Sequence, residues 1–233
     1  MPAPVSNDSL VIAGATGPLG NEVLRLLVGA QRFRQVQVLA REPITTGLRG
    51  VGTFDVPGDD PAAWPFVKAG TAVVMFDPPR MFYQRERALW TPKPQQLPAL
   101  ARWLHASGVS TVAIVLPHAQ MRLPEALKRG LADLDEHTVA QLGFDRLLFV
   151  RTPSKAGAAR ERHPLQRLAN WVLAALKYMI PTTEQPVRAV KVAQFVASAL
   201  KVAPSGIHVA APETVWQAAQ GDVDTVVRGW LGM

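Results

Sequence analysis

The stretch Val11-Ile12-Ala13-Gly14-Ala15-Thr16-Gly17-Pro18-Leu19-Gly20 decides how this chain folds. It opens with a short apolar run, closes on spaced glycines and leads directly into an amphipathic segment over residues 21–30. That order is typical of a strand, a tight turn and the N-terminus of a helix. We therefore predict that an α/β fold with parallel strands starts here.

The glycines have separate expected roles in such a turn. Gly14 permits a turn that a Cβ would block, Gly17 lets the backbone approach a phosphate, and Gly20 lets the helix pack close to the strand. Free N–H groups at the helix start, together with the helix dipole, attract anions. The pattern G-x-x-G-x-x-G therefore predicts a site for the pyrophosphate of a dinucleotide. The commoner spacing is G-x-G-x-x-G, and a purely structural turn is the alternative.

Strand and helix patterns alternate along the chain. Strands are predicted at 11–13, 36–40, 51–56, 71–76, 109–116, 144–150 and 206–210. Helices are predicted at 19–28, from Asp60-Pro61, at 94–107, at 124–142, near 190–200 and from Pro212. A helical apolar stripe over 165–179 is predicted to lie in the core. This alternation predicts a doubly wound parallel sheet, a Rossmann-like α/β fold, with one domain over residues 1–233.

The composition argues against several kinds of site. The chain has no cysteine, and its five histidines contain no H-x-x-x-H pair, so we expect no metal site. No apolar run approaches the ~20 residues that cross a membrane, and residues 1–9 do not resemble a secretory signal. Because the absence of cysteine fits a reducing compartment, we expect a cytoplasmic protein.

The net charge of +7 is concentrated in one part of the chain. Between Arg151 and Lys191 there are eight Lys or Arg residues and two Glu residues. This segment is either an anion-binding face for nucleic acid or a phosphorylated ligand, or a solvated helix face. Since neither an aromatic-interleaved basic motif nor a helix-turn-helix pattern accompanies the charge, we expect no nucleic-acid partner.

The end of the second predicted strand bears on the choice of dinucleotide. In this fold, an acidic residue there binds the ribose 2′-hydroxyl of NAD, whereas an arginine accommodates the 2′-phosphate of NADP. The strand ends Leu39-Ala40-Arg41, and the first acidic residue, Glu42, comes after the arginine. The sequence therefore predicts NADP(H), with NAD(H) less favoured. An arginine that simply faces solvent is the alternative.

Several segments together resemble the atypical short-chain dehydrogenase/reductases. These are the glycine stretch, residues 36–41, Phe76-Asp77, and Phe144-Asp145-Arg146 leading to Arg151-Thr152-Pro153. The chain looks most like the small NAD(P)H-binding branch related to the Tat-interacting tumour-suppressor protein, and the likeness covers nearly the whole chain. This resemblance implies a Rossmann fold that binds NADP(H).

The resemblance also implies which residues would contact the cofactor. The pyrophosphate would lie against Gly14, Thr16, Gly17, Pro18, Leu19 and Gly20, and the 2′-phosphate against Arg41. The adenine would meet Asp55 and Val56, the ribose and nicotinamide would meet Phe76 and Asp77, and Pro153 would flank the nicotinamide ring. For each of these residues a purely structural role is the alternative, most of all for Asp55, because an Asp at a strand end often serves only as a turn or cap.

The chain departs from that family in its catalytic residues. The reductases usually carry a Ser at the end of the fifth strand and a Tyr and a Lys four residues apart on the next helix. The Tyr exchanges a proton with the substrate carbonyl, the Lys lowers the pKa of the Tyr, and the Ser orients the carbonyl oxygen. Here the strand ends Val115-Leu116-Pro117-His118, and Lys128 and Ala132 stand at the Tyr and Lys positions. Neither tyrosine, Tyr83 or Tyr178, has a Lys four residues on.

Two functions follow from this pattern. One is a non-catalytic NADP(H)-binding protein whose cofactor occupancy is sensed by a partner, and we favour it because the usual Ser-Tyr-Lys set is missing. The other is an NADPH-dependent oxidoreductase in which His118, Tyr83 or Lys128 replaces the proton donor. Whether the chain is an enzyme stays open at this point, as do its substrate, its small-molecule or protein partner and its oligomeric state.

Overall fold

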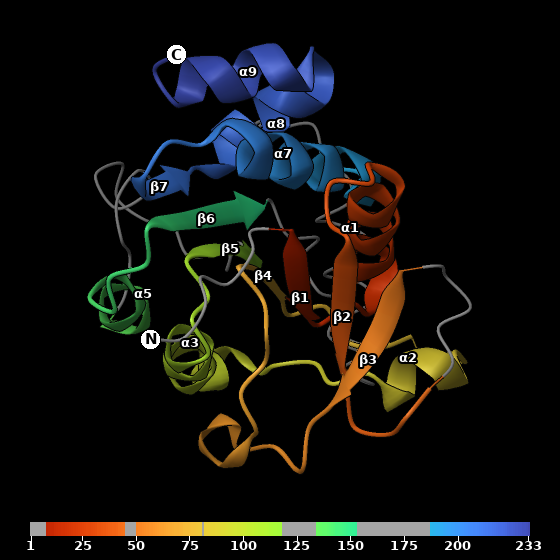
Figure 1. Cartoon of the computed structure of the whole chain (residues 1–233). Helices are drawn as coiled ribbons and strands as arrows, with labels where there is room; N and C mark the ends of the chain where they lie inside the picture. The colour runs from red at the N-terminus through yellow and green to blue at the C-terminus, as the bar shows by residue number, and fades with distance from the viewer. Residues whose placement is uncertain (1–7, 45–49, 81, 118–133, 153–186) are drawn as a thin grey trace, which may run out of the picture.

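The computed structural model describes residues 8–44, 50–80, 82–117, 134–152 and 187–233 (Figure 1). In this part of the chain, seven strands form a parallel sheet in the order β3-β2-β1-β4-β5-β6-β7. The strands are β1 Ser9–Ala13, β2 Gln35–Ala40, β3 Val51–Asp55, β4 Thr71–Met75, β5 Thr111–Pro117, β6 Arg146–Thr152 and β7 Gly206–Ala210.

The direction in which strands are added reverses beside β1. Leu10 of β1 is in register with Val36 of β2 on one side and with Thr71 of β4 on the other. In open α/β sheets, ligands bind outside the carboxyl ends of the strands at such a reversal. The strand order confirms the predicted doubly wound fold and places the glycine turn at this switch point.

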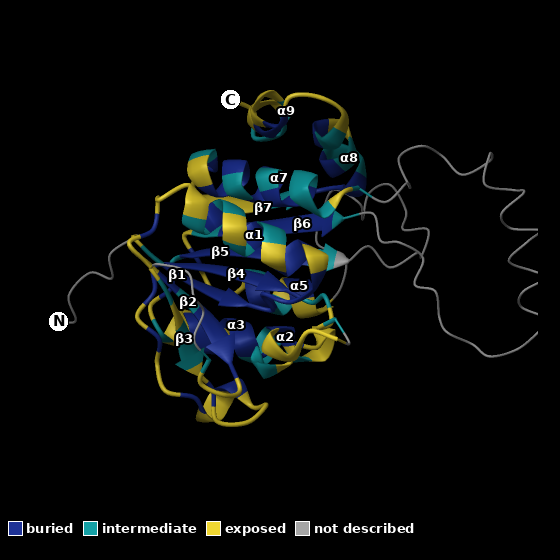
Figure 2. Ribbon diagram, turned by 90° about the vertical axis from the view of Figure 1, so that its right-hand side faces the viewer, coloured by how far each residue is buried: buried dark blue, intermediate teal, exposed yellow. Residues whose placement is uncertain are grey.

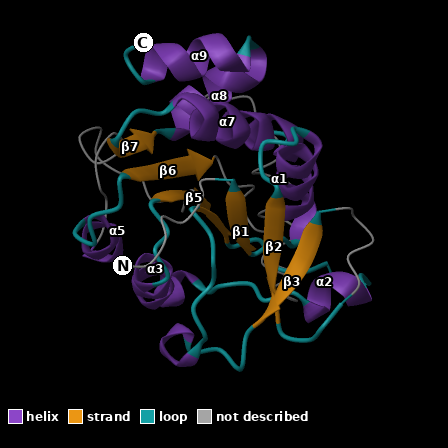
Figure 3. Cartoon of the chain, viewed as in Figure 1, coloured by secondary structure: helices purple, strands orange, loops and turns teal. Residues whose placement is uncertain are grey.

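Helices cover both faces of the sheet (Figure 3). The α-helices are α1 Gly17–Gly29, α2 Gln84–Ala88, α3 Leu97–Ala106, α5 Leu134–Ala140, α7 Ala189–Val202, α8 Pro212–Gln220 and α9 Val223–Trp230. Short 3₁₀ helices are η1 Pro61–Ala63 and η2 Pro94–Gln96. Buried side chains of α1, α7, α8 and α9 share one core cluster, and those of α3 and α5 share the other.

Alternation along the strands separates the two core clusters. Leu10 and Ile12 pack in the cluster of α1, whereas Val11 and Ala13 pack in the cluster of α3. β4 is buried at each position, as its continuous apolar run predicts for a central parallel strand. Figure 2 shows the central strands as a buried layer between helices whose outer sides are exposed.

The structure divides two of the predicted helices differently. Residues 94–96 form the 3₁₀ helix η2, and the α-helix begins only at Leu97. The helix predicted from Pro212 ends at Gln220, and Asp222 starts a second one by accepting the Thr225 N–H at 2.8 Å. Of the helix predicted at 124–142, the structure describes the part from residue 134 onward, where α5 forms over Leu134–Ala140. The stripe over 165–179 lies outside the described residues, and no described helix is long and apolar enough to cross a membrane.

Candidate functional site

The first and third glycines of the turn are required by close backbone packing. Gly14 has φ +77°, and a Cβ there would lie 2.0 Å from the carbonyl oxygen of Met75. A Cβ on Gly20 would lie 2.6 Å from the carbonyl carbon of Ala15. Gly14 therefore allows β1 to approach the end of β4, and Gly20 allows α1 to approach the turn.

The start of α1 offers two backbone donors to an anion. Thr16 occupies the N-cap position, but its hydroxyl donates to the Asp77 carbonyl oxygen and lies 2.9 Å from the Thr91 hydroxyl instead of capping the helix. Pro18 has no N–H, and the Gly20 N–H bonds to Thr16 within the helix. The N–H groups of Gly17 and Leu19 are therefore the donors of the first turn that point away from the helix.

Two carboxylates bind these donors. The Gly17 N–H donates to Oε2 of Glu86 at 3.0 Å, and the Asn21 side chain donates to Oε1 of Glu86 at 2.8 Å. The Leu19 N–H donates to the carboxylate of Asp77. Glu86 is only 5% exposed. A buried acidic side chain from α2 thus lies at the N-terminus of α1, where the helix dipole favours negative charge.

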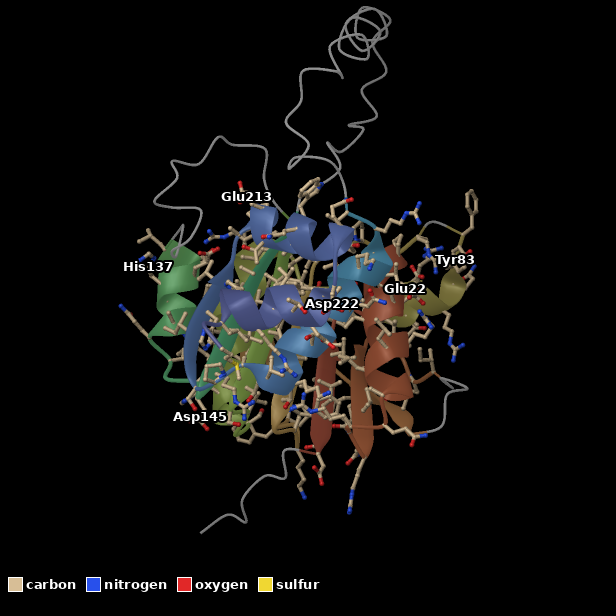
Figure 4. All side chains as sticks on the ribbon, turned by 90° about the horizontal axis from the view of Figure 1, so that it is seen from above. Glu22, Tyr83, His137, Asp145, Glu213 and Asp222 are labelled. Atoms are coloured by element: carbon tan, nitrogen blue, oxygen red, sulfur yellow. The ribbon has the colours of Figure 1, made fainter. Side chains whose placement is uncertain are left out.

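Arg80 completes the surroundings of Glu86. The Arg80 backbone N–H donates to Oε2 of Glu86 at 2.9 Å. In the guanidinium, Nε donates to Oε1 of Glu86 at 2.8 Å, and Nη2 donates to the same oxygen. The guanidinium also lies 3.7 Å from the centre of the Tyr83 ring. Figure 4 shows Tyr83 on the same side of the molecule as Glu22 of α1.

The two carboxylates at this helix end have opposite pKa shifts. Burial raises the pKa of Glu86, but hydrogen bonds from Arg80, Gly17 and Asn21 outweigh it and lower that pKa to about 2. Burial raises the pKa of Asp77, and the hydrogen bond from Leu19 opposes this only in part. Glu86 is therefore ionised at neutral pH and supplies the negative charge that the helix end attracts.

The last residue of α2 and the residues just after it cross the ends of β1 and β2. The Arg41 N–H donates to the Ala88 carbonyl at 2.8 Å, and the Trp90 N–H donates to the Leu39 carbonyl at 2.9 Å. The Trp90 carbonyl in turn accepts the Gly14 N–H at 3.1 Å. This segment therefore lies over the strand ends at which the sequence predicted the dinucleotide (Figure 1).

The residues predicted for the adenosine half lie at the ends of β2 and β3. Arg41 forms an ion pair with Oδ1 of Asp59 at 2.9 Å, and its side chain is about half exposed. Asp55 is the exposed last residue of β3, whereas Val56 is buried and donates its N–H to Ala40 at 2.9 Å. Arg41 therefore faces a carboxylate of its own chain.

The structure brings most of the sequence-predicted residues to one edge of the sheet. Thr16, Gly17 and Leu19 each lie against Asp77 there, with Pro18 exposed at the same turn and Phe76 half-buried before Asp77. Outside the described residues lie Pro153, His118, Lys128, Ala132 and Tyr178.

Sequence reasoning missed Glu86, Arg80 and Asp59. A signal for Glu86 was present, because it is the only acidic residue in the arginine-rich stretch from 80 to 94.

Among the described residues, no group of three His, Cys, Asp or Glu side chains is placed to hold a metal ion.

A buried ion pair lies at the carboxyl end of β6. Arg151 and Glu136 of α5 are joined at 2.6 Å, and each side chain is 4% exposed. Arg151 opens the basic segment that the sequence singled out, yet here its charge is balanced inside the protein. Its position indicates a role in holding α5 against the sheet, because a buried charge needs a partner.

Comparisons with known proteins agree with this fold. No family model and no curated protein matches the sequence. The triphenylmethane reductase of Citrobacter sp. has a TM-score of 0.52 at 16% identity over 85% of this chain and 67% of that one. Its complex with NADP(H) gives 0.51 at 15% identity over 85% and 68%. A nucleoside-diphosphate-sugar epimerase from Staphylococcus aureus gives 0.48 at 13% identity over 97% and 96%. At such identities, the likeness to the reductase shows the fold alone.

Proposed function

We propose that this chain binds NADP(H) at the carboxyl ends of β1, β2 and β4, as a protein of the atypical short-chain dehydrogenase/reductase type. The observation that carries the proposal is the start of α1, where the Gly17 and Leu19 N–H groups both bind anionic oxygens at the switch point of the sheet. Carboxylate oxygens of the chain stand there for the phosphate oxygens of the dinucleotide. The donor set therefore fits a pyrophosphate chemically.

The proposed preference for NADP(H) over NAD(H) rests on Arg41. It follows Ala40, the last residue of β2, which is in register with Asp55 of β3, and it already binds an anionic oxygen of Asp59. A 2′-phosphate carries more negative charge than a carboxylate and presents three acceptor oxygens to a guanidinium. If the 2′-phosphate replaced Asp59 as the partner of Arg41, Arg41 would bind the phosphate as the sequence predicts.

Replacement of Arg41 tests the cofactor preference. In Arg41→Ala, we expect NADPH affinity to fall by about 1.5–3 kcal/mol, the worth of a charge-assisted hydrogen bond, with little change for NADH. Calorimetric titration of both dinucleotides measures the two affinities. Equal binding of NADPH and NADH by the unchanged protein would contradict the preference.

We further propose that the bound dinucleotide is not used for ordinary carbonyl reduction. β5 ends in Leu116 and Pro117, which carry no hydroxyl to orient a substrate carbonyl. Of the substitute donors, Tyr83 is the one within the described residues, and its half-exposed ring packs against the guanidinium of Arg80, which binds Glu86 at the start of α1. That placement is the observation that favours an oxidoreductase as the second candidate function.

Turnover assays separate the two functions. Because general acid–base help is worth ~10²–10⁴ in rate, we expect NADPH binding with little or no oxidation of NADPH by generic aldehydes, ketones or quinones. Absorbance of NADPH follows the reaction. Steady turnover that Tyr83→Phe, His118→Ala or Lys128→Ala abolished would establish an oxidoreductase and identify its donor. Turnover that survived all three would also contradict a non-catalytic role.

A further inference from the structure

Both groups predicted to bind phosphate already bind carboxylates of the same chain. Glu86 and Asp77 accept the N–H groups at the start of α1, and Asp59 binds Arg41. Glu86 differs from the other two because it is nearly inaccessible and is held by three partners, Gly17, Asn21 and Arg80. Its carboxylate therefore occupies the helix end in the way that a bound anion would.

We propose that Glu86 is an internal competitor for the dinucleotide, and that binding exchanges its carboxylate for the pyrophosphate and transfers Arg80 to the phosphate. This inference rests on the proposed function, because it concerns the same site. It adds two residues, Glu86 and Arg80, that control access to that site.

Electrostatics explain why the carboxylate and the pyrophosphate exclude each other. Glu86 accepts the Gly17 N–H at 3.0 Å, so a phosphate oxygen that used this donor would meet a carboxylate within a few ångströms. Like charges at that separation repel, and water screens the repulsion little at Glu86, which is only 5% exposed. Glu86 also stays ionised at neutral pH, because its pKa is lowered to about 2. Protonation of Glu86 therefore does not remove the repulsion at neutral pH, and the side chain must move before a phosphate can bind.

The same movement would release Arg80. Its guanidinium is held by Glu86 and is about one-third exposed, so it can reach a ligand at the edge of the helix. Arginine pairs readily with phosphate oxygens through two parallel hydrogen bonds. The ion pair that Arg80 loses with Glu86 would thus be replaced by an ion pair with a phosphate of the cofactor.

The anchoring of the segment limits the movement to α2. Trp90 is fully buried and bonds through its backbone to Leu39 and Gly14, so the chain after α2 is fixed to the sheet. At the start of α2, Tyr83 is half-exposed, and Phe82 before it is 90% exposed. A displacement of the five-residue helix about this fixed end would expose little apolar surface.

Removal of one charge tests the inference. In Glu86→Gln, we expect NADPH to bind about tenfold more tightly (1.4 kcal/mol), because a neutral acceptor holds the Gly17 N–H and Arg80 less strongly than a carboxylate does. Glu22→Gln is the matched control, since Glu22 lies on α1 near the same site and, like Glu86, pairs with an arginine, Arg25 at 2.7 Å. We expect its affinity to stay within about twofold of the unchanged protein, as for an exposed pair.

The outcomes are distinguishable. If the unchanged protein binds NADPH and Glu86→Gln binds it equally or more weakly, the inference is overturned and the proposed function stands. If none of the three proteins binds NADPH, the proposed function fails and the inference with it. Arg80→Ala in the Glu86→Gln background is expected to weaken NADPH binding about tenfold, and an unchanged affinity would overturn the role of Arg80.

Hydrogen exchange on the unchanged protein gives a second readout, which does not depend on how the variants fold. On addition of NADPH, we expect slower exchange of the amides at 14–20 and faster exchange of those of α2, because Glu86 no longer fixes that helix to Gly17. A ligand that merely covered the site would slow exchange in both segments. Slower exchange in α2 would overturn the inference.

Discussion

Gly14→Ala is expected to lower the free energy of unfolding by more than about 4 kcal/mol, which leaves little folded protein. The added Cβ would lie 2.0 Å from the carbonyl oxygen of Met75, and that oxygen belongs to the backbone of a central strand that cannot move aside. The residue would also have to keep φ +77°, which costs an L-residue roughly 1–2 kcal/mol by itself. Urea unfolding followed by circular dichroism measures the loss.

Gly29→Ala is the control for this change. Gly29 ends the same helix that Gly14 precedes, and a Cβ there would have no heavy atom within 4 Å. Because alanine is the better helix former, we expect a stability within about 1 kcal/mol of the unchanged protein, or slightly above it. A folded Gly14→Ala protein with the stability of Gly29→Ala would contradict the geometry of the turn.

The glycines separate what the sequence could predict from what it could not. Gly20 acts through a backbone contact with Ala15 inside the turn, so the motif alone indicates its need. Gly14 and Gly17 are different, because a Cβ on Gly14 would meet the backbone of Met75 and a Cβ on Gly17 would meet the side chain of Asp77 at 3.0 Å. The Gly17 N–H also binds Glu86. These partners lie 60 or more residues away, and no local sequence pattern predicts the path of the chain between them.

The same distinction applies to the larger elements. The continuous apolar run at Thr71–Met75 predicts a central strand, because a strand that is buried on both faces carries apolar residues at successive positions. The break between α8 and α9 also had a local signal in Gly221-Asp222, a helix stop followed by an N-cap, and it was missed. By contrast, the ion pair of Arg41 with Asp59 depends on how the loop after β3 folds back. The sequence therefore predicted that Arg41 faces solvent or binds a phosphate, and it did not predict the ion pair with Asp59.

Trp90→Ala is expected to lower the free energy of unfolding by about 3–5 kcal/mol, as for other buried large-to-small changes. Its ring is fully buried, lies 4.7 Å from Trp64 in an edge-to-face arrangement and donates through Nε1 to Asp59 at 3.1 Å. Trp90→Phe should recover much of this loss, because it keeps the aromatic packing and gives up the hydrogen bond. Phe82→Ala should change stability by less than about 0.5 kcal/mol, since Phe82 is 90% exposed. Thermal and urea unfolding measure all three variants, and a Trp90→Ala protein as stable as Phe82→Ala would show that Trp90 does not fix the segment after α2 to the sheet.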